Sequence, residues 1–313
     1  MSLLKIYQLE SKNGQRCIGI QTQDGMFTFA KDLFESQDLI VSAGDLNLSD
    51  VIAERFNELG KICLGSAEEI LSTGSGYKVI KPLKPAEVWA VGVTYRRQAL
   101  EHDKDLQKKK NSTDRLYEYV HLNKRVEVFF KGFDRTSSGP FEECQLRADS
   151  QQVLPEAELV LVLSATGKVI AYTMGNDLTA WDIELECPLY LNQAKIWNGS
   201  GSLGPCLIPV ECIPSPYAFE FKCHVDRNGE RIISSSGNTQ DLKRSLEEMI
   251  HYLKFNNDVP AGAVLFTGTT CVIPHDFALL DGDVMTVECE PFGQLVNTAC
   301  RSKSPEEKYN TRL

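Results

Sequence analysis

The chain has no apolar run that approaches the 18 residues of a membrane-spanning helix, and it has no surplus of basic residues. Its formal net charge is −10 and its isoelectric point is about 5.1. Nucleic acids and anionic membranes are bound by basic surfaces, so the composition argues against both kinds of partner. An anionic small molecule is still compatible with this charge, because it needs only a local positive site, which a bound metal ion supplies.

The ten cysteines include no Cys-x-x-Cys pair, and most of them lie in apolar or strand-like sequence, as Cys271 and Cys289 do. This pattern is typical of reduced, buried thiols rather than of a disulfide framework or a zinc site. The chain also begins without the charged and apolar segments of a signal peptide. We therefore expect a cytoplasmic protein.

The sequence predicts two folded units and a short tail. Residues 1–80 contain three short strand patterns, separated by Asn-Gly and Asp-Gly turns, and then a helical pattern near residues 49–59, which together predict a small N-terminal α+β domain. The proline-containing stretch at residues 81–85 marks the boundary. A larger domain follows over residues 81–300, and residues 301–313 are expected to form a flexible polar tail.

The larger unit is predicted to be rich in β-strands. Short strand patterns separated by turns recur from residue 126 onwards, and one helix interrupts them near residues 240–255, where an apolar stripe repeats at helical spacing. Residues 95–124 are densely charged and are expected to form a solvated helical excursion. These patterns indicate a mixed, β-rich α+β fold with a sizeable core.

Two glutamates stand at the start of one of these strands. Glu156 and Glu158 are two positions apart and precede the apolar run from Leu159 to Leu163, so their carboxylates are expected on the same face. A hairpin of this length can bring Asp177, which follows the next strand, close to them. Three neighbouring carboxylates repel one another unless a cation neutralises them, and such oxygen ligands suit Mg²⁺, with Mn²⁺ or Ca²⁺ as alternatives. The competing interpretation is that the glutamates face solvent and that Asp177 belongs to an ordinary turn.

Several separated motifs resemble the fumarylacetoacetate hydrolase superfamily, in the family's order, across about residues 85–300. They are Glu156-Ala-Glu158-Leu159, Gly175-Asn176-Asp177-Leu178-Thr179-Ala180-Trp181-Asp182, Lys195, Phe266-Thr267-Gly268-Thr269 and Asp281-Gly282-Asp283-Val284. The resemblance implies a β-roll core, in which a mixed sheet rolls around a central site, with a smaller N-terminal domain. It also implies that Glu156, Glu158 and Asp177 bind the metal, that the metal holds a small 2-oxo acid, and that the protein is a homodimer or homotetramer.

One position separates the branches of this superfamily. Its C–C hydrolases and decarboxylases use a histidine and a glutamate to activate water, and the matching stretch here keeps Glu101 but has Gln98 at the histidine position. A glutamine amide cannot take a proton from water near neutral pH. The motifs around Glu127, Glu158 and Lys195 instead resemble the 2-keto-3-deoxy-D-arabinonate dehydratase branch.

In that branch, the positions that match Lys195 and Glu127 carry the proton transfers. Lys195 is the candidate base for the C3 proton, which requires a lowered pKa, and Glu127 is the candidate acid for the departing C4 hydroxyl, but the two roles can be exchanged. A Schiff base on Lys195 is a further alternative. Lys131, Thr269 and Arg97 are candidate substrate contacts. The alternatives are that Lys131 holds a carboxylate ligand or forms a structural salt bridge, that Thr269 belongs to a turn, and that Arg97 is solvated.

The sequence therefore predicts a metal-dependent dehydratase, a carbon–oxygen lyase that removes water from a 2-keto-3-deoxy sugar acid and yields a dioxo acid. One alternative is a hydrolase or decarboxylase of acylpyruvate-type or fumarylacetoacetate-like 2-oxo acids with an unusual base. Another is a metal-stabilised protein without catalytic activity. Family members often carry Arg or Ser where Trp181 stands, so the sequence leaves the exact substrate open.

Overall fold

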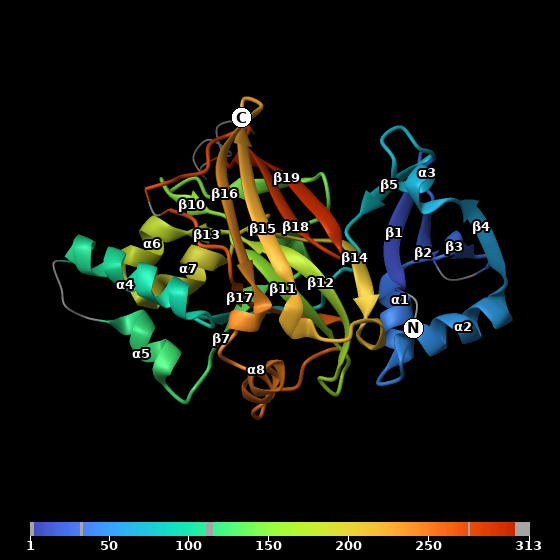
Figure 1. The fold of residues 1–313 in the computed structure, drawn as a ribbon, viewed down its shortest axis with the longest axis horizontal. Coiled ribbons are helices and arrows are strands. Elements are labelled where there is room, and N and C mark those ends of the chain that lie inside the picture. Colours follow the sequence, from blue (N-terminus) through green and yellow to red (C-terminus); the bar gives the residue numbers. More distant parts are fainter. Residues whose placement is uncertain (1–2, 32–33, 111–114, 275, 304–313) are drawn as a thin grey trace, which may run out of the picture.

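The computed structural model describes residues 3–31, 34–110, 115–274 and 276–303. Within these ranges the chain forms mainly β-strands, with short helices at the sides and lower edge of the view in Figure 1. No helix in these ranges is both long enough and apolar enough to cross a membrane. The mixed, β-rich α+β fold is therefore confirmed, whereas the predicted tail lies outside the described residues from position 304 onwards.

The larger sheet has twelve strands and joins sequence-distant parts of the chain. Its path runs β4-β3-β2-β1-β14-β12-β11-β17-β6-β7, with β5 paired to β1 and β8 paired to β14. Neighbours are antiparallel except for β6 beside β17 and β8 beside β14. The strands are β1 (Lys5–Ser11), β2 (Arg16–Thr22), β3 (Gly25–Phe29), β4 (Lys61–Gly65), β5 (Tyr77–Ile80), β6 (Val88–Gly92), β7 (Glu127–Gly132), β8 (Ser137–Ser138), β11 (Ala157–Leu163), β12 (Val169–Asp177), β14 (Gly201–Pro209) and β17 (Ala263–Thr269).

A second sheet of five strands crosses the front of the view in Figure 1, and a short strand pair lies near the site described below. The second sheet has the order β16-β15-β18-β19-β9, and the short pair is β10-β13. The strands are β9 (Glu143–Leu146), β10 (Val153–Leu154), β13 (Thr179–Ala180), β15 (Glu220–Arg227), β16 (Glu230–Asn238), β18 (Val284–Cys289) and β19 (Gly293–Arg301).

The helices are short. α4 and α5 form a pair at the left of Figure 1, where the sequence predicted a charged helical excursion, and α8 lies at its lower edge. α8 begins later than the pattern near 240–255 indicated, because a 3₁₀ turn occupies Thr239–Asp241 and the hydroxyl of Ser245 caps the helix by accepting from the backbone of Glu248. The helices are α1 (Ser36–Ala43), α2 (Leu48–Leu59), α3 (Ala67–Leu71), α4 (Arg96–Lys110), α5 (Leu116–Leu122), α6 (Trp181–Glu186), α7 (Leu191–Lys195) and α8 (Leu246–Leu253).

The central strand β11 is buried on both faces, which explains its unbroken apolar sequence. Leu159, Leu161 and Leu163 pack into one hydrophobic core, whereas Val160 and Val162 pack into another on the opposite face. Alternate side chains of a strand point to opposite faces, so one apolar run serves both cores. The glutamates at the start of this strand therefore lie next to a fully buried segment.

The N-terminal strands and helices lie together at the right of Figure 1. They share a core with the central strands, because Leu39 and Ile52 belong to the same hydrophobic cluster as Val160 and Phe266. Strand β1 also pairs with β14. The division of the chain at residues 80 and 81 into two domains stays a prediction.

The cysteines are all free, and none is part of a disulfide bond. Five of the ten are buried, four are half-buried, and Cys63 on β4 is exposed. Burial raises the pKa of the Cys144, Cys206 and Cys271 thiols to about 12 in each case. These thiols are therefore protonated and unreactive near neutral pH.

Candidate active site

Three carboxylates meet where the hairpin of β11 and β12 ends. The antiparallel pairing sets Glu158 opposite Gly175, and Asp177 is the last residue of β12. Oxygens of Glu156, Glu158 and Asp177 all lie within 4.8 Å of one another, and all three residues are buried. The structure thus brings together the three acids that the sequence predicted to converge, and it does not expose the glutamates to solvent.

Backbone contacts fix the carboxylates in place. The side-chain oxygen of Asn176 accepts a hydrogen bond from the backbone of Glu156 at 2.8 Å. The backbone nitrogen of Gly268 donates to Glu158 Oε2 at 2.7 Å. Gly268 has φ +94°, and a Cβ there would lie 2.0 Å from the hydroxyl of Thr94, so this position requires glycine. The Phe-Thr-Gly-Thr motif therefore supplies a donor to the acidic cluster.

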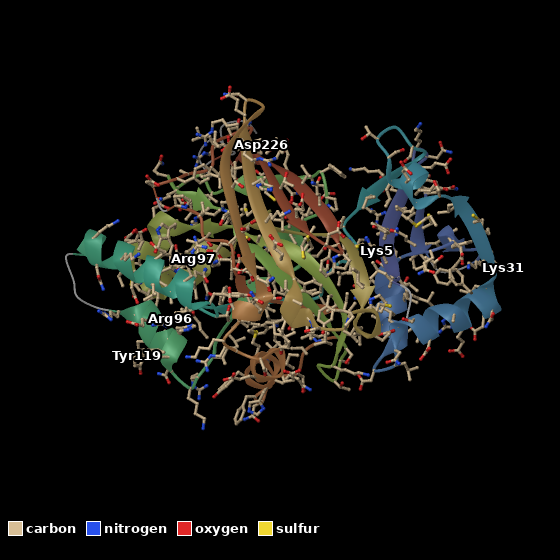
Figure 2. The ribbon with its side chains drawn as sticks, viewed as in Figure 1. Lys5, Lys31, Arg96, Arg97, Tyr119 and Asp226 are labelled. Atoms are coloured by element: carbon tan, nitrogen blue, oxygen red, sulfur yellow. The ribbon has the colours of Figure 1, made fainter. Side chains whose placement is uncertain are left out.

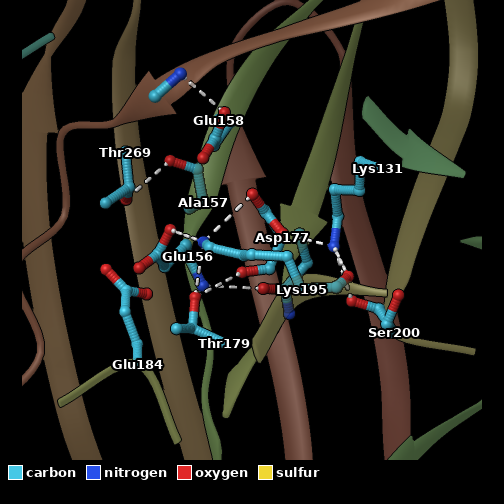
Figure 3. A network of polar contacts seen from close by, with 12 residues as sticks. Lys131, Glu156, Ala157, Glu158, Asp177, Thr179, Glu184, Lys195, Ser200 and Thr269 are labelled. Atoms are coloured by element: carbon cyan, nitrogen blue, oxygen red, sulfur yellow. Dashed lines mark hydrogen bonds and ion pairs between the residues drawn. The ribbon is translucent and has the colours of Figure 1, made fainter. Parts of the chain in front are cut away.

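Two lysines provide positive charge beside the acids (Figure 3). Lys195, the last residue of α7, places Nζ 2.9 Å from Glu156 Oε2, 3.2 Å from Asp177 Oδ2 and 2.6 Å from Thr179 Oγ1. Lys131 on β7 places Nζ 2.5 Å from Asp177 Oδ1. The sequence predicted a metal as the counter-charge, and the structure shows that two ammonium groups of the chain also contact these carboxylates.

The ammonium of Lys131 makes its contacts within the protein. Besides Asp177, its ammonium donates to the backbone oxygens of Lys195 at 2.8 Å and Ser200 at 3.2 Å. An ammonium has three donors, so all of them are engaged within the protein. This geometry favours the role of holding a carboxylate ligand over the predicted contact with substrate.

Charge and burial act together on the pKa values of the site. Burial, together with the carboxylates of Asp177 and Glu156, raises the pKa of Glu158 well above its usual value. Burial alone lowers the pKa of Lys195, but Asp177 and Glu156 outweigh this effect, so its pKa lies above the ordinary lysine value. Two carboxylates contact this ammonium, so the lowered pKa that its role as a base requires stays a prediction.

Glu127 is the first residue of β7 and lines the same cavity as Lys195. It pairs with Gly92 of β6, and a Cβ on Gly92 would lie 2.3 Å from Glu127 Oε2. The missing side chain at position 92 thus makes room for the carboxyl group. Burial raises the pKa of Glu127, and the charge of Lys195 opposes this only in part, so the protonated form is favoured compared with an exposed glutamate.

Sequence reasoning missed a second buried glutamate. Glu184 on α6 accepts a hydrogen bond from the hydroxyl of Tyr117 on α5 at 2.9 Å. Burial raises the pKa of Glu184 to about 7, against a partial opposing effect from Lys195. Its segment, Trp-Asp-Ile-Glu-Leu-Glu, has the acidic composition of a solvated helix start, so the sequence carried no signal of its burial. Thr179, which accepts from Lys195, was likewise not singled out.

The other predicted substrate contacts differ in position. Thr269 is buried near Glu156 in a small adjoining cavity, but its hydroxyl donates to the backbone oxygen of Ala157 at 3.0 Å. Arg97 lies exposed on α4, next to Arg96 (Figure 2), and does not line either cavity of the site. Gln98, one residue further along α4, lines both cavities.

The main cavity has a volume of about 30 Å³, which is small beside the roughly 300–1,000 Å³ of most ligand pockets. A sugar acid therefore fits only after the walls of this cavity rearrange. The polar lining consists of Gln98, His102, Tyr117, Glu127, Glu156, Glu158, Asp177, Glu184 and Lys195.

The acidic cluster fits a divalent metal. Its ligands are carboxylate oxygens, which hard cations such as Mg²⁺ and Mn²⁺ prefer, and they lie close enough to share one ion. The raised pKa of Glu158 also indicates repulsion among the three acids, and a cation would relieve it. Glu156, Glu158 and Asp177 are the residues that would hold the ion.

Fold and site together define an enzyme-like, β-rich protein with an oxygen-ligand metal centre. Residues 87–299 match the family model described as the C-terminal domain of fumarylacetoacetate (FAA) hydrolase. The chain belongs to the fumarylacetoacetate hydrolase family, as the sequence motifs indicated.

Similar proteins include a dehydratase and a probable dehydratase. The chain is 36% identical over 219 residues to 2-dehydro-3-deoxy-D-arabinonate dehydratase of Saccharolobus solfataricus, covering 70% of this chain and 73% of the relative. It is also 36% identical over 219 residues to a protein of Haloferax volcanii named as a probable 2-keto-3-deoxyxylonate dehydratase, covering 69% and 73%. A solved structure, 2-keto-3-deoxy-D-arabinonate dehydratase complexed with magnesium and 2,5-dioxopentanoate, superposes with a TM-score of 0.77 at 26% identity, covering 96% of this chain and all of that chain.

Replacing Lys131 by methionine is expected to destabilise the protein by about 3–5 kcal/mol, because the carboxylate of Asp177 stays buried with one cation fewer. Urea denaturation followed by circular dichroism measures this change. Lys222→Met is the matched control, since its ion pair with Glu288 is half-exposed and its loss is expected to leave the midpoint nearly unchanged. Equal midpoints for the two variants would contradict the structural role of Lys131.

Glu184→Gln is expected to alter how stability depends on pH. A glutamate whose folded pKa is about 7, above its ordinary 4.5, adds stability below about pH 4.5 and loses it as pH rises through 7. This loss amounts to about 3 kcal/mol in the wild type and is absent from the variant. Urea denaturation of chelator-treated protein between pH 5 and 8 measures it, with the exposed Glu220→Gln as control. Parallel curves for wild type and Glu184→Gln would rule out Glu184 as the titrating group.

Proposed function

We propose that the chain is a metal-dependent dehydratase that removes water from a 2-keto-3-deoxy sugar acid and yields a dioxo acid. The observation that carries this proposal is the joint placement of Lys195 and Glu127 in one cavity with three carboxylates suited to a metal. The 36% identity to two dehydratases of this type supports it, as does the fold shared with a dehydratase that binds magnesium and 2,5-dioxopentanoate.

A divalent cation bound to the triad supplies a Lewis acid that polarises the keto group of a 2-oxo acid. Glu156, Glu158 and Asp177 would hold the cation, and through it the keto group, within the buried site. The second carboxylate oxygen of Glu158 is already held by the backbone of Gly268, which limits the rotation of this side chain. The carboxylate end of the substrate would then lie beside Lys195 and Glu127, the two candidate proton-transfer groups.

Lys195 is the proposed base that removes a proton from C3. Its ammonium must first lose a proton, and its contacts with Glu156 and Asp177 oppose this. A cation held by those carboxylates would compete with the ammonium for them and add a positive charge nearby, and both changes would lower the pKa of Lys195. Lys195 would then gain the properties of a base when the site is loaded.

Glu127 is the proposed acid for the C4 hydroxyl. The electrons of the broken C3–H bond form the C3–C4 double bond, the C4–O bond breaks, and the proton of Glu127 completes the departing water. Burial raises the pKa of Glu127 and so favours the protonated carboxyl that this step needs. Tautomerisation of the dehydrated acid then gives the dioxo product.

A second candidate function rests on His102. Gln98 occupies the position at which the family's hydrolases carry their histidine, and it cannot act as a base. His102 lies one helical turn further along α4 and lines both cavities of the site. A hydrolase of acylpyruvates would use this imidazole to activate water.

The assembly and the cellular location are part of the same proposal. We infer a homodimer or homotetramer in the cytoplasm, on the basis of the family resemblance and of ten cysteines without a disulfide partner. The proposed partner is a small 2-oxo acid.

The proposed activity is expected to depend on a divalent cation. Purified protein is incubated with 2-keto-3-deoxy acids and with acylpyruvates, in the presence of EDTA or of excess Mg²⁺. We expect a semialdehyde from a 2-keto-3-deoxy acid, a loss of at least about 100-fold with EDTA, and recovery with Mg²⁺. Pyruvate and a carboxylate released from an acylpyruvate would support the hydrolase instead, and binding of Mg²⁺ without any product would support a protein without catalysis.

The roles of Lys195 and Glu127 are distinguished by hydrogen exchange at C3 in D₂O, followed by NMR. Both Lys195→Met and Glu127→Gln are expected to lower dehydration by about 10²–10⁴-fold. Glu127→Gln should retain exchange at C3, because the base is intact, whereas Lys195→Met should lose it. The opposite pattern would exchange the two roles, and the surface variants Lys222→Met and Glu220→Gln serve as matched controls.

A further inference from the structure

The amide of Gln98 is a polar group of the cavity that the proposed mechanism leaves unused. Gln98 lies on α4 with 6% of its surface exposed, and it lines the cavity that contains Glu127, Glu156 and Lys195. Its side-chain oxygen is buried and accepts no hydrogen bond from the described residues. Buried amide oxygens are nearly always hydrogen-bonded, so this oxygen points to a ligand that donates to it.

Neighbouring polar groups on the same wall already have protein contacts. The hydroxyl of Tyr117 donates to Glu184 at 2.9 Å. The hydroxyl of Thr269 donates to the backbone of Ala157. Gln98 therefore retains the hydrogen-bonding capacity that a substrate can use.

The chemistry of the substrate decides which of its groups meets this oxygen. An acceptor needs a donor, and neither the carboxylate nor the keto group of a 2-oxo acid carries a hydrogen to donate. The C4 hydroxyl also carries a donor hydrogen, but it receives the proton of Glu127 and departs as water. In a five-carbon 2-keto-3-deoxy acid, the donor that stays on the carbon chain is the hydroxyl on C5.

We propose that Gln98 binds the C5 hydroxyl and thereby selects 2-oxo acids that are hydroxylated beyond the reacting carbon. This inference rests on the proposed function. A glutamine amide suits the task, because it both accepts from and donates to a hydroxyl and stays neutral beside the buried acids. A histidine at this position would instead gain a charge near neutral pH.

The test compares two substrates and two variants. One substrate is 2-keto-3-deoxypentonate, and the other is 4-hydroxy-2-oxopentanoate, which has the same reacting carbons but lacks the C5 hydroxyl. Gln98→Met keeps the length of the side chain and removes its hydrogen bonds. Gln23→Met, at an exposed turn between β2 and β3, makes the same chemical change outside the cavity.

We expect Gln98→Met to lower kcat/KM for the hydroxylated acid by about 10-fold, mainly through KM, and to change that for the deoxygenated acid less than twofold. Gln23→Met should match the wild type with both substrates. Equal effects of Gln98→Met on the two acids, including no effect on either, would overturn the inference. Thermal unfolding of each variant shows whether the cavity wall is still folded.

Binding separates this inference from the proposed function. Calorimetric titration of both acids into Mg²⁺-loaded protein needs no turnover. Wild type that produces no water-loss product from either acid refutes the proposed function. In that case, the contact with Gln98 is still supported if the wild type binds the hydroxylated acid about 10-fold more tightly and Gln98→Met abolishes this preference. If the wild type shows no such preference, the contact is refuted as well.

Discussion

Asp177 receives an ammonium group on each of its carboxylate oxygens, Lys131 on Oδ1 and Lys195 on Oδ2. The neighbouring buried glutamates would otherwise repel Asp177 strongly, because little water is present to screen their charges. Backbone carbonyls anchor Lys131, whereas the other contacts of Lys195 are to side chains. Backbone oxygens therefore help to hold Lys131, whereas side chains alone hold the ammonium of Lys195.

The sheet determines where these charges lie. A hairpin with both strands in the core ends in two of the acids, and β7 contributes Lys131 and Glu127 from the far end of the same sheet. Gly92 leaves space for the carboxyl group of Glu127, and Gly268 leaves space for the hydroxyl of Thr94. Helical residues contribute the remaining polar wall. Strands thus contribute the charged centre of the site, and α4 and α5 contribute part of its polar wall.

The sequence predicted most of what depends on local pattern. The unbroken apolar run and the spacing of Glu156 and Glu158 indicated a buried strand with two carboxylates, and the motifs indicated the family. The burial of Glu184 was not predictable, because its partner Tyr117 lies 67 residues away and its own segment looks solvated. The raised pKa of Lys195 likewise follows from contacts that form only in the folded chain. Local periodicity likewise does not predict that the N-terminal elements share a hydrophobic core with the central strands.

The distribution of thiols gives the protein a native attachment point. Cys63 is exposed at the edge strand β4, while Cys144, Cys206 and Cys271 are buried with strongly raised pKa values. A maleimide fluorophore or spin label added to the folded chain would react first at Cys63. The label would then report on the N-terminal strands and leave the acidic cluster untouched. Spectroscopic studies of this protein can therefore begin without engineering a cysteine-free background.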